Sequence, residues 1–470
     1  MTQNQIERVH FIGVGGVGMS GIARVAHDQG MVVTGSDLKE SRYTKQLEEA
    51  GITVFVGQAA ENIPTDPLPD VVVVSTAIME NNPELVEAKR LGIPVVHRAR
   101  MLAALGMGKK TLAVAGTHGK TTTSSMVASI LDGMGADPTF LIGGIVRAYQ
   151  TNAHSGSGEY YVVEADESDK SFTYLDPLGV LVTNVEADHL DHYSDLDEIY
   201  AKFAEFMASV PEEGVVVVCD EEHELVELAR GTGRRVITYG QTKTADVKIL
   251  SWGASGVGSI FVLQMPDGTT VQGRVKQNPG RHNVLNAAGA LSLLWGVGED
   301  VQAAADALAE FAGVRRRFDL VGEANGVTIV DDYAHHPTEI AATISAARKL
   351  DFNAVHVLFQ PHRYSRLPLF TEVLRSDFAH AFDQADSVTF MDVYAAGEVP
   401  VPGVNGKTFM DVLEDSSDHP SLTYIHHRLD VVPSLVERVK PGDLVITMGA
   451  GDVTAMGPSL LAALQDKANA

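Results

Sequence analysis

The feature that most constrains the fold is the segment GTHGKTTT at residues 116–123, which directly follows the apolar run 111–115. An apolar run of this kind is typical of a buried strand, and residues 122–131 after the loop read as a helix. A strand that enters a loop containing glycine and lysine and then a helix is the phosphate-binding element of proteins that bind nucleoside triphosphates. The segment therefore predicts an α/β domain that holds a triphosphate at a helix N-terminus.

Each residue type in this loop suits a bound triphosphate. Gly116 and Gly119 allow the backbone to turn its N–H groups inward, and Lys120 can bring a positive charge to the β and γ phosphates. The hydroxyl of Thr121 can ligate magnesium. We also expect the neighbouring loop residues at the nucleotide: Thr117, His118 and Thr122. A polar turn without a ligand does not explain a lysine followed by three threonines.

The length of 470 residues is too great for one hydrophobic core, and domains of about 150 residues suggest three. A net charge of -25 argues against a nucleic-acid or anionic-membrane surface. Cys219 is the single cysteine, which excludes an internal disulfide. No apolar run approaches the roughly 18 residues of a membrane span, and the N-terminus lacks the regions of a signal peptide, so we expect a cytoplasmic protein.

Short apolar segments alternate with polar, helix-like segments along three sections, which we place at residues 1–107, 108–320 and 321–470. This alternation predicts parallel sheets with crossover helices, and so an α/β fold in each section. Residues 247–275 are rich in glycine and serine with alternating apolar residues, which favours a small antiparallel patch over a helix. The expected strands are 9–12, 32–34, 53–56, 71–75, 95–96, 111–115, 160–164, 180–183, 215–219, 236–239, 327–330, 354–359, 387–391 and 444–447.

The first section opens with a second glycine-rich loop, which contains Gly13, Gly15, Gly16 and Gly18 and follows an apolar strand. Asp37 lies 19 residues beyond Gly18, at the end of the next expected strand. This spacing is that of a dinucleotide-binding fingerprint, in which glycines let the backbone approach a diphosphate. The fingerprint does not specify the nucleotide, so an NAD-linked oxidoreductase is a competing class of function.

Two strands in the central section end in residues that could hold a metal. Glu164 ends the strand 160–164, and a carboxylate there offers the hard oxygen ligand that magnesium prefers. His189 follows the strand 180–183 within a polar loop. Histidine is an unusual magnesium ligand, and a single one is more often structural, but open α/β sheets bind ligands at this end of their strands. On the residues alone the assignment of His189 stays open.

The last part of the chain supplies polar residues whose roles spacing alone does not decide. Asn283 begins a helical stretch, and its amide could pair with adenine or cap the helix. Arg363 and Arg366 stand one turn apart if they are helical, so they could grip a carboxylate or a phosphate together. Two solvated arginines are an equally good interpretation of that spacing.

The ordered set of motifs resembles the Mur ligases, the ATP-dependent amide-forming enzymes of peptidoglycan synthesis, over essentially the whole chain. The motifs that carry the resemblance are GVGGVGMSG, GTHGKTTT, DDYAHHP and PHRYSR. The resemblance implies an N-terminal Rossmann-like domain for a UDP-sugar and a central P-loop ATPase-type domain with a mostly parallel sheet. It also implies a C-terminal Rossmann-like ligase domain that closes over the nucleotide.

The resemblance further implies the chemistry. ATP would phosphorylate the lactyl carboxylate of UDP-N-acetylmuramate, and the amino group of L-alanine would attack the acyl phosphate. Lys120 and magnesium would offset charge on the transferring phosphoryl group.

The implied metal ligands are Thr121, Glu164 and His189. Residues implied at ATP, in addition to the loop, are Asn283, Arg317, Asp332 and His335. Those implied at the uridine nucleotide are Gly13, Gly15, Gly16, Gly18, Asp37, Ser75, His97 and Arg98. Arg363 and Arg366 would orient the alanine carboxylate.

One position departs from several sibling ligases, which carry a carbamylated lysine about fifteen residues after the metal-binding histidine. Ala204 stands there, and Lys202 is two residues out of register, so what replaces the carbamate is open. Within the family, a recycling ligase that attaches a whole tripeptide to the same sugar nucleotide has similar motifs. The oxidoreductase alternative leaves the GTHGKTTT loop unexplained. We expect a monomer or a weak homodimer.

Overall fold

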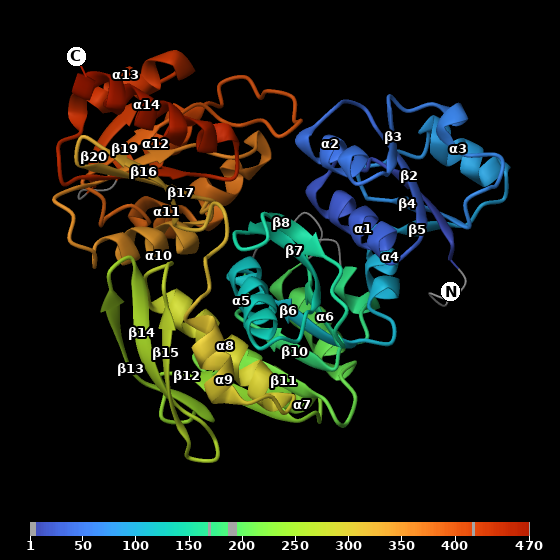
Figure 1. Cartoon of the computed structure of the whole chain (residues 1–470). Helices are drawn as coiled ribbons and strands as arrows, with labels where there is room; N and C mark the ends of the chain where they lie inside the picture. The colour runs from blue at the N-terminus through green and yellow to red at the C-terminus, as the bar shows by residue number, and fades with distance from the viewer. Residues whose placement is uncertain (1–5, 168–170, 187–194, 416–418, 470) are drawn as a thin grey trace. The chain divides into compact units, whose positions relative to one another are not determined.

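The computed structural model describes residues 6–167, 171–186, 195–415 and 419–469. Its internal contacts divide the chain into two compact units. The first comprises Met1–Ser251, Phe261–Arg274 and Leu285–Phe311, and the second comprises Trp252–Ile260, Val275–Val284 and Ala312–Ala470. Three sheets build these units, which confirms the predicted α/β fold (Figure 1).

The N-terminal sheet has five parallel strands in the order β3-β2-β1-β4-β5. The strands are β1 (Arg8–Ile12), β2 (Val32–Asp37), β3 (Thr53–Val56), β4 (Val71–Val74) and β5 (Val95–His97), and the helices are α1 (Val17–Asp28), α2 (Arg42–Glu49), α3 (Pro83–Arg90) and α4 (Arg98–Leu105). All five expected strands are therefore confirmed. The glycine loop leaves β1 between its neighbours β2 and β4, the switch point at which open α/β sheets bind ligands.

The central sheet has ten strands in the order β15-β14-β13-β12-β11-β10-β6-β9-β7-β8. Its strands are β6 (Lys110–Ala115), β7 (Thr139–Val146), β8 (Thr151–His154), β9 (Tyr160–Glu164), β10 (Gly179–Val182), β11 (Val215–Cys219), β12 (Val236–Gly240), β13 (Val247–Ser255), β14 (Gly258–Gln264) and β15 (Thr270–Val275). The pairings from β7 through β9, β6, β10, β11 and β12 to β13 are parallel, and β7 pairs antiparallel with β8. The expected strands of this section are confirmed, whereas the hairpin of β7 and β8 was not predicted.

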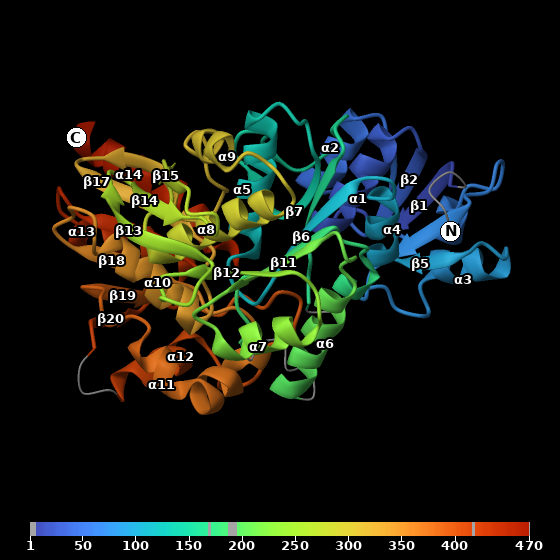
Figure 2. The same ribbon diagram turned by 90° about the horizontal axis from the view of Figure 1, so that it is seen from below.

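Helices cover both faces of the central sheet, which explains why its strands read as continuous apolar runs rather than as alternating ones. The helices are α5 (Lys120–Gly133), α6 (Leu196–Ala208), α7 (His223–Gly231), α8 (Arg281–Gly296) and α9 (Val301–Leu308). Figure 2 shows α5 and α9 on one face of the sheet and α6 and α7 on the other. The valines of β11 are fully buried between these layers.

The C-terminal sheet has six strands in the order β16-β17-β21-β18-β19-β20, all parallel except β16. Its strands are β16 (Asp319–Ala324), β17 (Val327–Asp332), β18 (Val355–Phe359), β19 (Ser387–Phe390), β20 (Ser421–Tyr424) and β21 (Leu444–Met448). Its helices are α10 (Pro337–Ala347), α11 (Arg375–His380), α12 (Gly406–Glu414), α13 (Arg428–Arg438) and α14 (Met456–Asn469). The edge strands β16 and β20 were not predicted, and the domain boundary expected at residue 320 falls inside β16.

Among the helices of the described residues, none combines the length and the apolar composition that crossing a membrane requires.

Candidate active site

The loop between β6 and α5 has the backbone that a phosphate cradle requires. Gly116 has φ +124° and Gly119 has φ +84°, values in the region that favours glycine. A Cβ atom on Gly116 would lie 2.2 Å from Oγ1 of Thr183, so the loop also needs glycine for close packing. Thr122 lies in the first turn of α5 and is buried.

Residues after the neighbouring strand β10 hold this loop in place. The side-chain oxygen of Asn184 accepts a hydrogen bond from the N–H of His118 (2.8 Å), and the Thr183 hydroxyl donates to the His118 carbonyl (2.5 Å). The N–H of Glu186 donates to the hydroxyl of Thr117 (2.8 Å). Sequence reasoning missed these supporting contacts, although Leu181 and its neighbours pair with β6 and bring the residues after β10 to the loop.

Lys120 is enclosed by polar partners at the start of α5. Its Nζ atom donates to the carbonyls of Gly116 (2.5 Å) and Thr117 (3.1 Å) and to Oε1 of Glu167 (2.8 Å). Burial alone would lower the pKa of Lys120, but the carboxylate of Glu167, followed by that of Asp166, outweighs it and raises the pKa. The lysine is therefore charged at neutral pH. Burial raises the pKa of Glu167 to about 7 in spite of the adjacent lysine.

Two oxygen groups that suit magnesium meet beside this lysine. The hydroxyl of Thr121 donates to Oε1 of Glu164 (3.0 Å), and the N–H of Gly143 donates to Oε2 (2.7 Å). Burial raises the pKa of Glu164, and a bound cation would compensate that buried charge. An aligned hydroxyl and carboxylate fit the oxygen preference of magnesium. His189, the third predicted ligand, lies outside the described residues.

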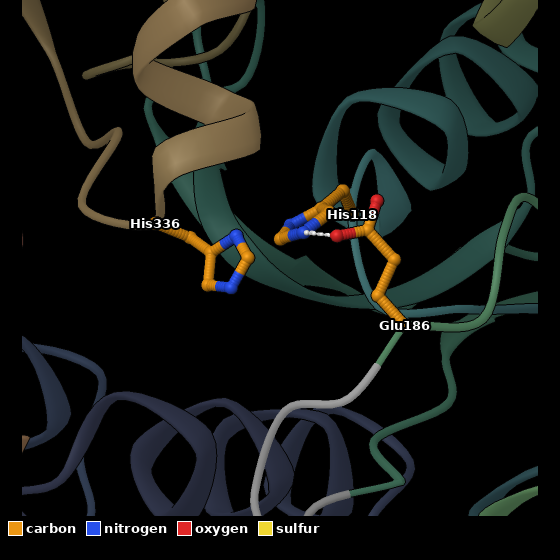
Figure 3. A group of neighbouring side chains, drawn as sticks. All are labelled: His118, Glu186 and His336. Atoms are coloured by element: carbon orange, nitrogen blue, oxygen red, sulfur yellow. Dashed lines mark ion pairs between the residues drawn. The ribbon is translucent and has the colours of Figure 1, made fainter. Parts of the chain in front are cut away.

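His118 forms an ion pair at the same loop. Its Nε2 atom lies 3.4 Å from Oε2 of Glu186, the contact that is dashed in Figure 3. Both side chains come from segments that follow central strands, β6 for His118 and β10 for Glu186. The imidazole is thus oriented by a carboxylate that sequence reasoning did not assign.

A cavity of about 830 Å³ lies in the first unit. It is lined by most residues predicted at the uridine nucleotide: Gly13, Gly16, Gly18, Asp37, Ser75 and Arg98. Glu164 and Asp166 line the same cavity, so it extends from the glycine loop to the predicted metal ligand. Gly15 and His97 are not among the lining residues. His97 instead accepts a hydrogen bond from the N–H of Ala99 (3.4 Å) at the start of α4.

Asp37, the acidic residue of the dinucleotide-binding fingerprint, is hydrogen-bonded to the N-terminal glycine loop. Oδ2 of Asp37 accepts a hydrogen bond from the N–H of Gly15 (2.8 Å). A Cβ atom on Gly15 would lie 2.8 Å from that oxygen, so a larger residue would displace the carboxylate. Asp37 therefore shapes the loop in addition to lining the cavity.

In the second unit, basic side chains gather around His362. Burial lowers the pKa of His362 to about 4, and the positive charges of His335, Arg366 and Arg363 add to the effect. The rings of His335 and His362 lie 6.2 Å apart, and His335 packs edge-on against Tyr333. Nδ1 of His362 and Nη1 of Arg366 are buried and have no hydrogen-bond partner among the described residues. The cluster can therefore accept an anionic ligand.

The two arginines do not share a helical face, in contrast to the helical interpretation of their spacing. Arg363 has φ +67° and precedes the short 3₁₀ helix Tyr364–Arg366. Its N–H donates to the carbonyl of Tyr394 (2.8 Å), which fixes this unusual backbone. Arg363 and Arg366 thus reach His362 from a turn rather than from one face of an α-helix.

The other residues predicted at the nucleotide have polar partners within the second unit. The amide of Asn283 donates to the carbonyl of Pro279 (3.0 Å). Arg317 lies 3.7 Å from Oε1 of Glu339 and over the ring of Tyr333.

The carboxylate of Asp332 is bound by the backbone around it. It accepts hydrogen bonds from the N–H groups of Phe318 (2.7 Å) and Ala334 (2.8 Å). Burial raises the pKa of Asp332 to about 6. Asp332 therefore anchors the segment that carries His335.

Lys202 points to a neighbour on its own helix. Its Nζ lies 2.6 Å from Oε2 of Glu205 on α6, and the same helix carries Ala204. This contact gives no reason to assign Lys202 the role of the carbamylated lysine.

Comparison with known families accounts for this arrangement of sheets and motifs. Residues 8–110 match the model of the Mur ligase family catalytic domain, residues 114–294 the Mur ligase middle domain, and residues 316–451 the Mur ligase glutamate ligase domain. The chain belongs to the Mur ligase family. Members of this family use ATP, which agrees with the loop between β6 and α5.

Curated relatives share nearly the whole length of the chain. The UDP-N-acetylmuramate--L-alanine ligase of Thermobifida fusca is 46% identical over 471 residues, which cover 98% of this chain and 97% of the relative. The ligase of the same name from Carboxydothermus hydrogenoformans is 44% identical over 454 residues, with 96% of each chain covered.

Solved structures agree with this family. The UDP-N-acetylmuramate-alanine ligase MurC of Thermotoga maritima matches with a TM-score of 0.80 and 30% identity, over 98% of this chain and 99% of that one. A murein peptide ligase of Psychrobacter arcticus matches with a TM-score of 0.69 and 26% identity, over the same shares.

Proposed function

We propose that this chain is an ATP-dependent ligase that joins L-alanine to the lactyl carboxylate of UDP-N-acetylmuramate through an acyl phosphate. The proposal draws on the relatives at 44–46% identity, whose names state this pair of substrates. It also draws on the GTHGKTTT loop, which accounts for ATP.

The observation that carries the proposal is the continuity of the 830 Å³ cavity. Gly16 and Gly18 line one part of it and offer a fingerprint loop to the diphosphate of the sugar nucleotide. Glu164 lines the same cavity and touches the hydroxyl of Thr121 in the triphosphate loop. A single ligand bound there would have its nucleotide at one end and its reactive carboxylate beside the γ phosphate.

The reaction balances in two displacements. A lactyl carboxylate oxygen attacks the γ phosphorus, and the bond to the bridging oxygen of ADP breaks. The nitrogen of L-alanine then attacks the carbonyl carbon, loses a proton and expels inorganic phosphate. Lys120 contributes by holding a positive charge at the loop, and it must exchange Glu167 for a phosphate oxygen to do so.

Magnesium is the metal that these residues fit. Thr121 and Glu164 would hold it, and His189 is proposed as a further ligand. When bound, magnesium would neutralise charge on the phosphates that face it.

The basic cluster around His362 suits the incoming amino acid. Arg366 would bind the alanine carboxylate, because its Nη1 atom is buried without a partner among the described residues. Arg363 would add positive charge. Asn283, Arg317, Asp332 and His335 are proposed at the adenine nucleotide, and their observed internal contacts would orient them.

A ligase that attaches a peptide is the second candidate, because the Psychrobacter murein peptide ligase shares the fold at 26% identity. Its lower identity makes L-alanine the preferred acceptor. We expect a cytoplasmic enzyme, active as a monomer or a weak homodimer.

Phosphate release from ATP tests the proposal directly. With UDP-N-acetylmuramate present, we compare L-alanine, glycine, L-serine and a tripeptide as acceptors. L-alanine should give the highest kcat/KM. A preference for the tripeptide would favour the peptide-adding activity, and release that does not require the sugar nucleotide would contradict both.

A further inference from the structure

A fully buried carboxylate lies between α3 and the N-terminal sheet. Glu84 is in the first turn of α3 and has no exposed surface. Its Oε2 atom accepts hydrogen bonds from Nε2 of His10 (2.9 Å) and the hydroxyl of Ser36 (2.7 Å). Its Oε1 atom accepts from the N–H of Ala59 (3.2 Å) and the amide of Asn62 (2.9 Å). The contacts come from three segments of the chain: β1, β2 and residues 59–62.

The charge of Glu84 is retained in this apolar surrounding. Burial alone would raise the pKa of Glu84, but the hydrogen bonds from His10, Ser36 and Asn62 outweigh it and lower the pKa. A buried charge without such partners would be strongly destabilising. Four donors aimed at one carboxylate therefore form a rigid connection between the segments that supply them.

One side of this connection leads to the glycine loop. The hydroxyl of Ser36 donates to Glu84, and the carbonyl of the same Ser36 accepts hydrogen bonds from the N–H groups of Gly13 (2.8 Å) and Val14 (2.9 Å). Gly13 lines the cavity that we assign to the sugar nucleotide. Glu84 is thus one residue removed from the loop that would hold the diphosphate.

The other side leads to a different wall of the cavity. Ala59 precedes the short 3₁₀ helix Ala60–Asn62, of which Asn62 is the last residue, and Gln58 just before it lines the cavity. Oε1 of Gln58 accepts a hydrogen bond from the amide of Asn82 (2.7 Å), another lining residue. Asn82 in turn caps α3, because its side-chain oxygen accepts from the N–H of Glu84 (2.9 Å).

We propose that Glu84 is a positioning residue for the UDP-sugar, which ties the glycine loop and the Gln58–Asn82 wall into one preorganised cavity. The inference rests on the proposed function, because it assumes that the cavity binds the sugar nucleotide. Glu84 touches no substrate in this scheme. It acts by fixing the groups that do, so its loss weakens binding of the UDP-sugar and leaves the chemical step unchanged.

The variant Glu84→Gln tests this with the smallest change of shape. An amide nitrogen can face Ser36 and His10, because a hydroxyl can rotate and an imidazole can change tautomer. The fold is therefore retained while the charge that holds four donors is lost. We expect calorimetry to show about tenfold weaker binding of UDP-N-acetylmuramate, and turnover to show a higher KM for it with unchanged kcat and unchanged KM for ATP.

The C-terminal sheet offers a matched control. His356 there bonds to Ser387 through Nδ1 (2.7 Å) and to the buried carboxylate of Asp443 through Nε2 (3.1 Å), the same arrangement as around His10. Asp443→Asn should lower the melting temperature as Glu84→Gln does, but it should leave the affinity for the sugar nucleotide unchanged. Equal losses of that affinity in both variants would overturn the inference, because general destabilisation would then explain them.

A second variant tests the inference if Glu84→Gln does not fold. Ser36→Ala removes one donor and keeps the carbonyl that holds Gly13, so it should weaken binding several-fold. Wild-type affinity in the folded Glu84→Gln, or in Ser36→Ala if the first variant does not fold, would overturn the inference. If the wild-type protein itself binds no UDP-N-acetylmuramate, the proposed function fails. If the wild type binds it and the variants bind it equally well, only the inference about Glu84 fails.

Discussion

Lys120 supplies the positive charge of the triphosphate loop. Its side chain is 13% exposed, and its donors are all directed at Gly116, Thr117 and Glu167. The motif predicted the lysine, but Glu167 was visible only in the structure. Nothing in the spacing of 47 residues between the two indicates that they touch, because the contact depends on the pairing of β6 with β9.

Replacing Lys120 by alanine should lower kcat by about 10² to 10³, since one preorganised charge contact to the transition state is lost. Phosphate release with all substrates saturating measures it. Lys110→Ala is the control, because Lys110 is half exposed and pairs with Glu159 on the surface. An active Lys120→Ala enzyme would remove the lysine from the phosphoryl step.

Arg366→Lys should raise the KM for L-alanine about tenfold, roughly the 1.4 kcal/mol of a weakened charge-assisted contact, because lysine cannot reproduce a two-point contact with a carboxylate. The KM for ATP should stay nearly constant. Arg375→Lys serves as the control, since Arg375 is exposed and pairs with Asp415. If the KM for ATP rises and that for L-alanine does not, Arg366 belongs to the triphosphate.

Among the secondary-structure elements, the hairpin of β7 and β8 connects α1, the helix that begins in the N-terminal glycine loop, to the central sheet. The amide of Asn152 on β8 donates to the carbonyl of Val17 at the start of α1 (3.1 Å). Sequence reasoning found the strands that are continuous apolar runs, and it missed β7 and β8. The sequence of β7 is interrupted by two glycines, and β8 is short and polar. A strand at the edge of a sheet is not covered on all sides, so its sequence need not be a continuous apolar run.

Gly21 allows α1 to approach this hairpin. A Cβ atom there would lie 3.1 Å from side-chain atoms of Asn152 and Leu141. Gly21→Val should therefore lower the free energy of unfolding by about 1 to 3 kcal/mol through overpacking. It should also raise the KM for the UDP-sugar, because Leu141 lines the cavity.

Denaturant unfolding and kinetics together check this prediction. Gly253→Val is the control, since a Cβ atom on Gly253 meets nothing within 4 Å. A Gly21→Val enzyme with wild-type stability would show that the hairpin can shift without cost. Unchanged KM in a destabilised enzyme would separate the hairpin from the cavity.

On the scale of the whole molecule, the two halves of the proposed reaction belong to different units. Lys120 and Glu164 lie in the first unit, and His362 and Arg366 lie in the second. The three-section organisation was predictable because each section repeats the alternation of apolar strands and helices. The network around Glu84 was not, because His10 and Glu84 are 74 residues apart and only the folded sheet unites them.

Turnover should therefore require the two units to approach each other. Small-angle scattering should record a smaller radius of gyration when a non-hydrolysable ATP analogue and UDP-N-acetylmuramate are added together, and a smaller effect with either alone. Magnesium is kept constant in all samples. A radius that does not respond, in an enzyme that turns over, would argue against domain closure.

The proposed mechanism requires a carboxylate of the sugar nucleotide to become an acyl phosphate before L-alanine attacks. UDP-N-acetylmuramate labelled with ¹⁸O at both oxygens of its lactyl carboxylate tests it, because one of the two leaves with the phosphate when the amide forms. Mass spectrometry of the products should find one ¹⁸O in each inorganic phosphate and an amide between the lactyl group and L-alanine. Phosphate without label, or label in AMP, would contradict this mechanism.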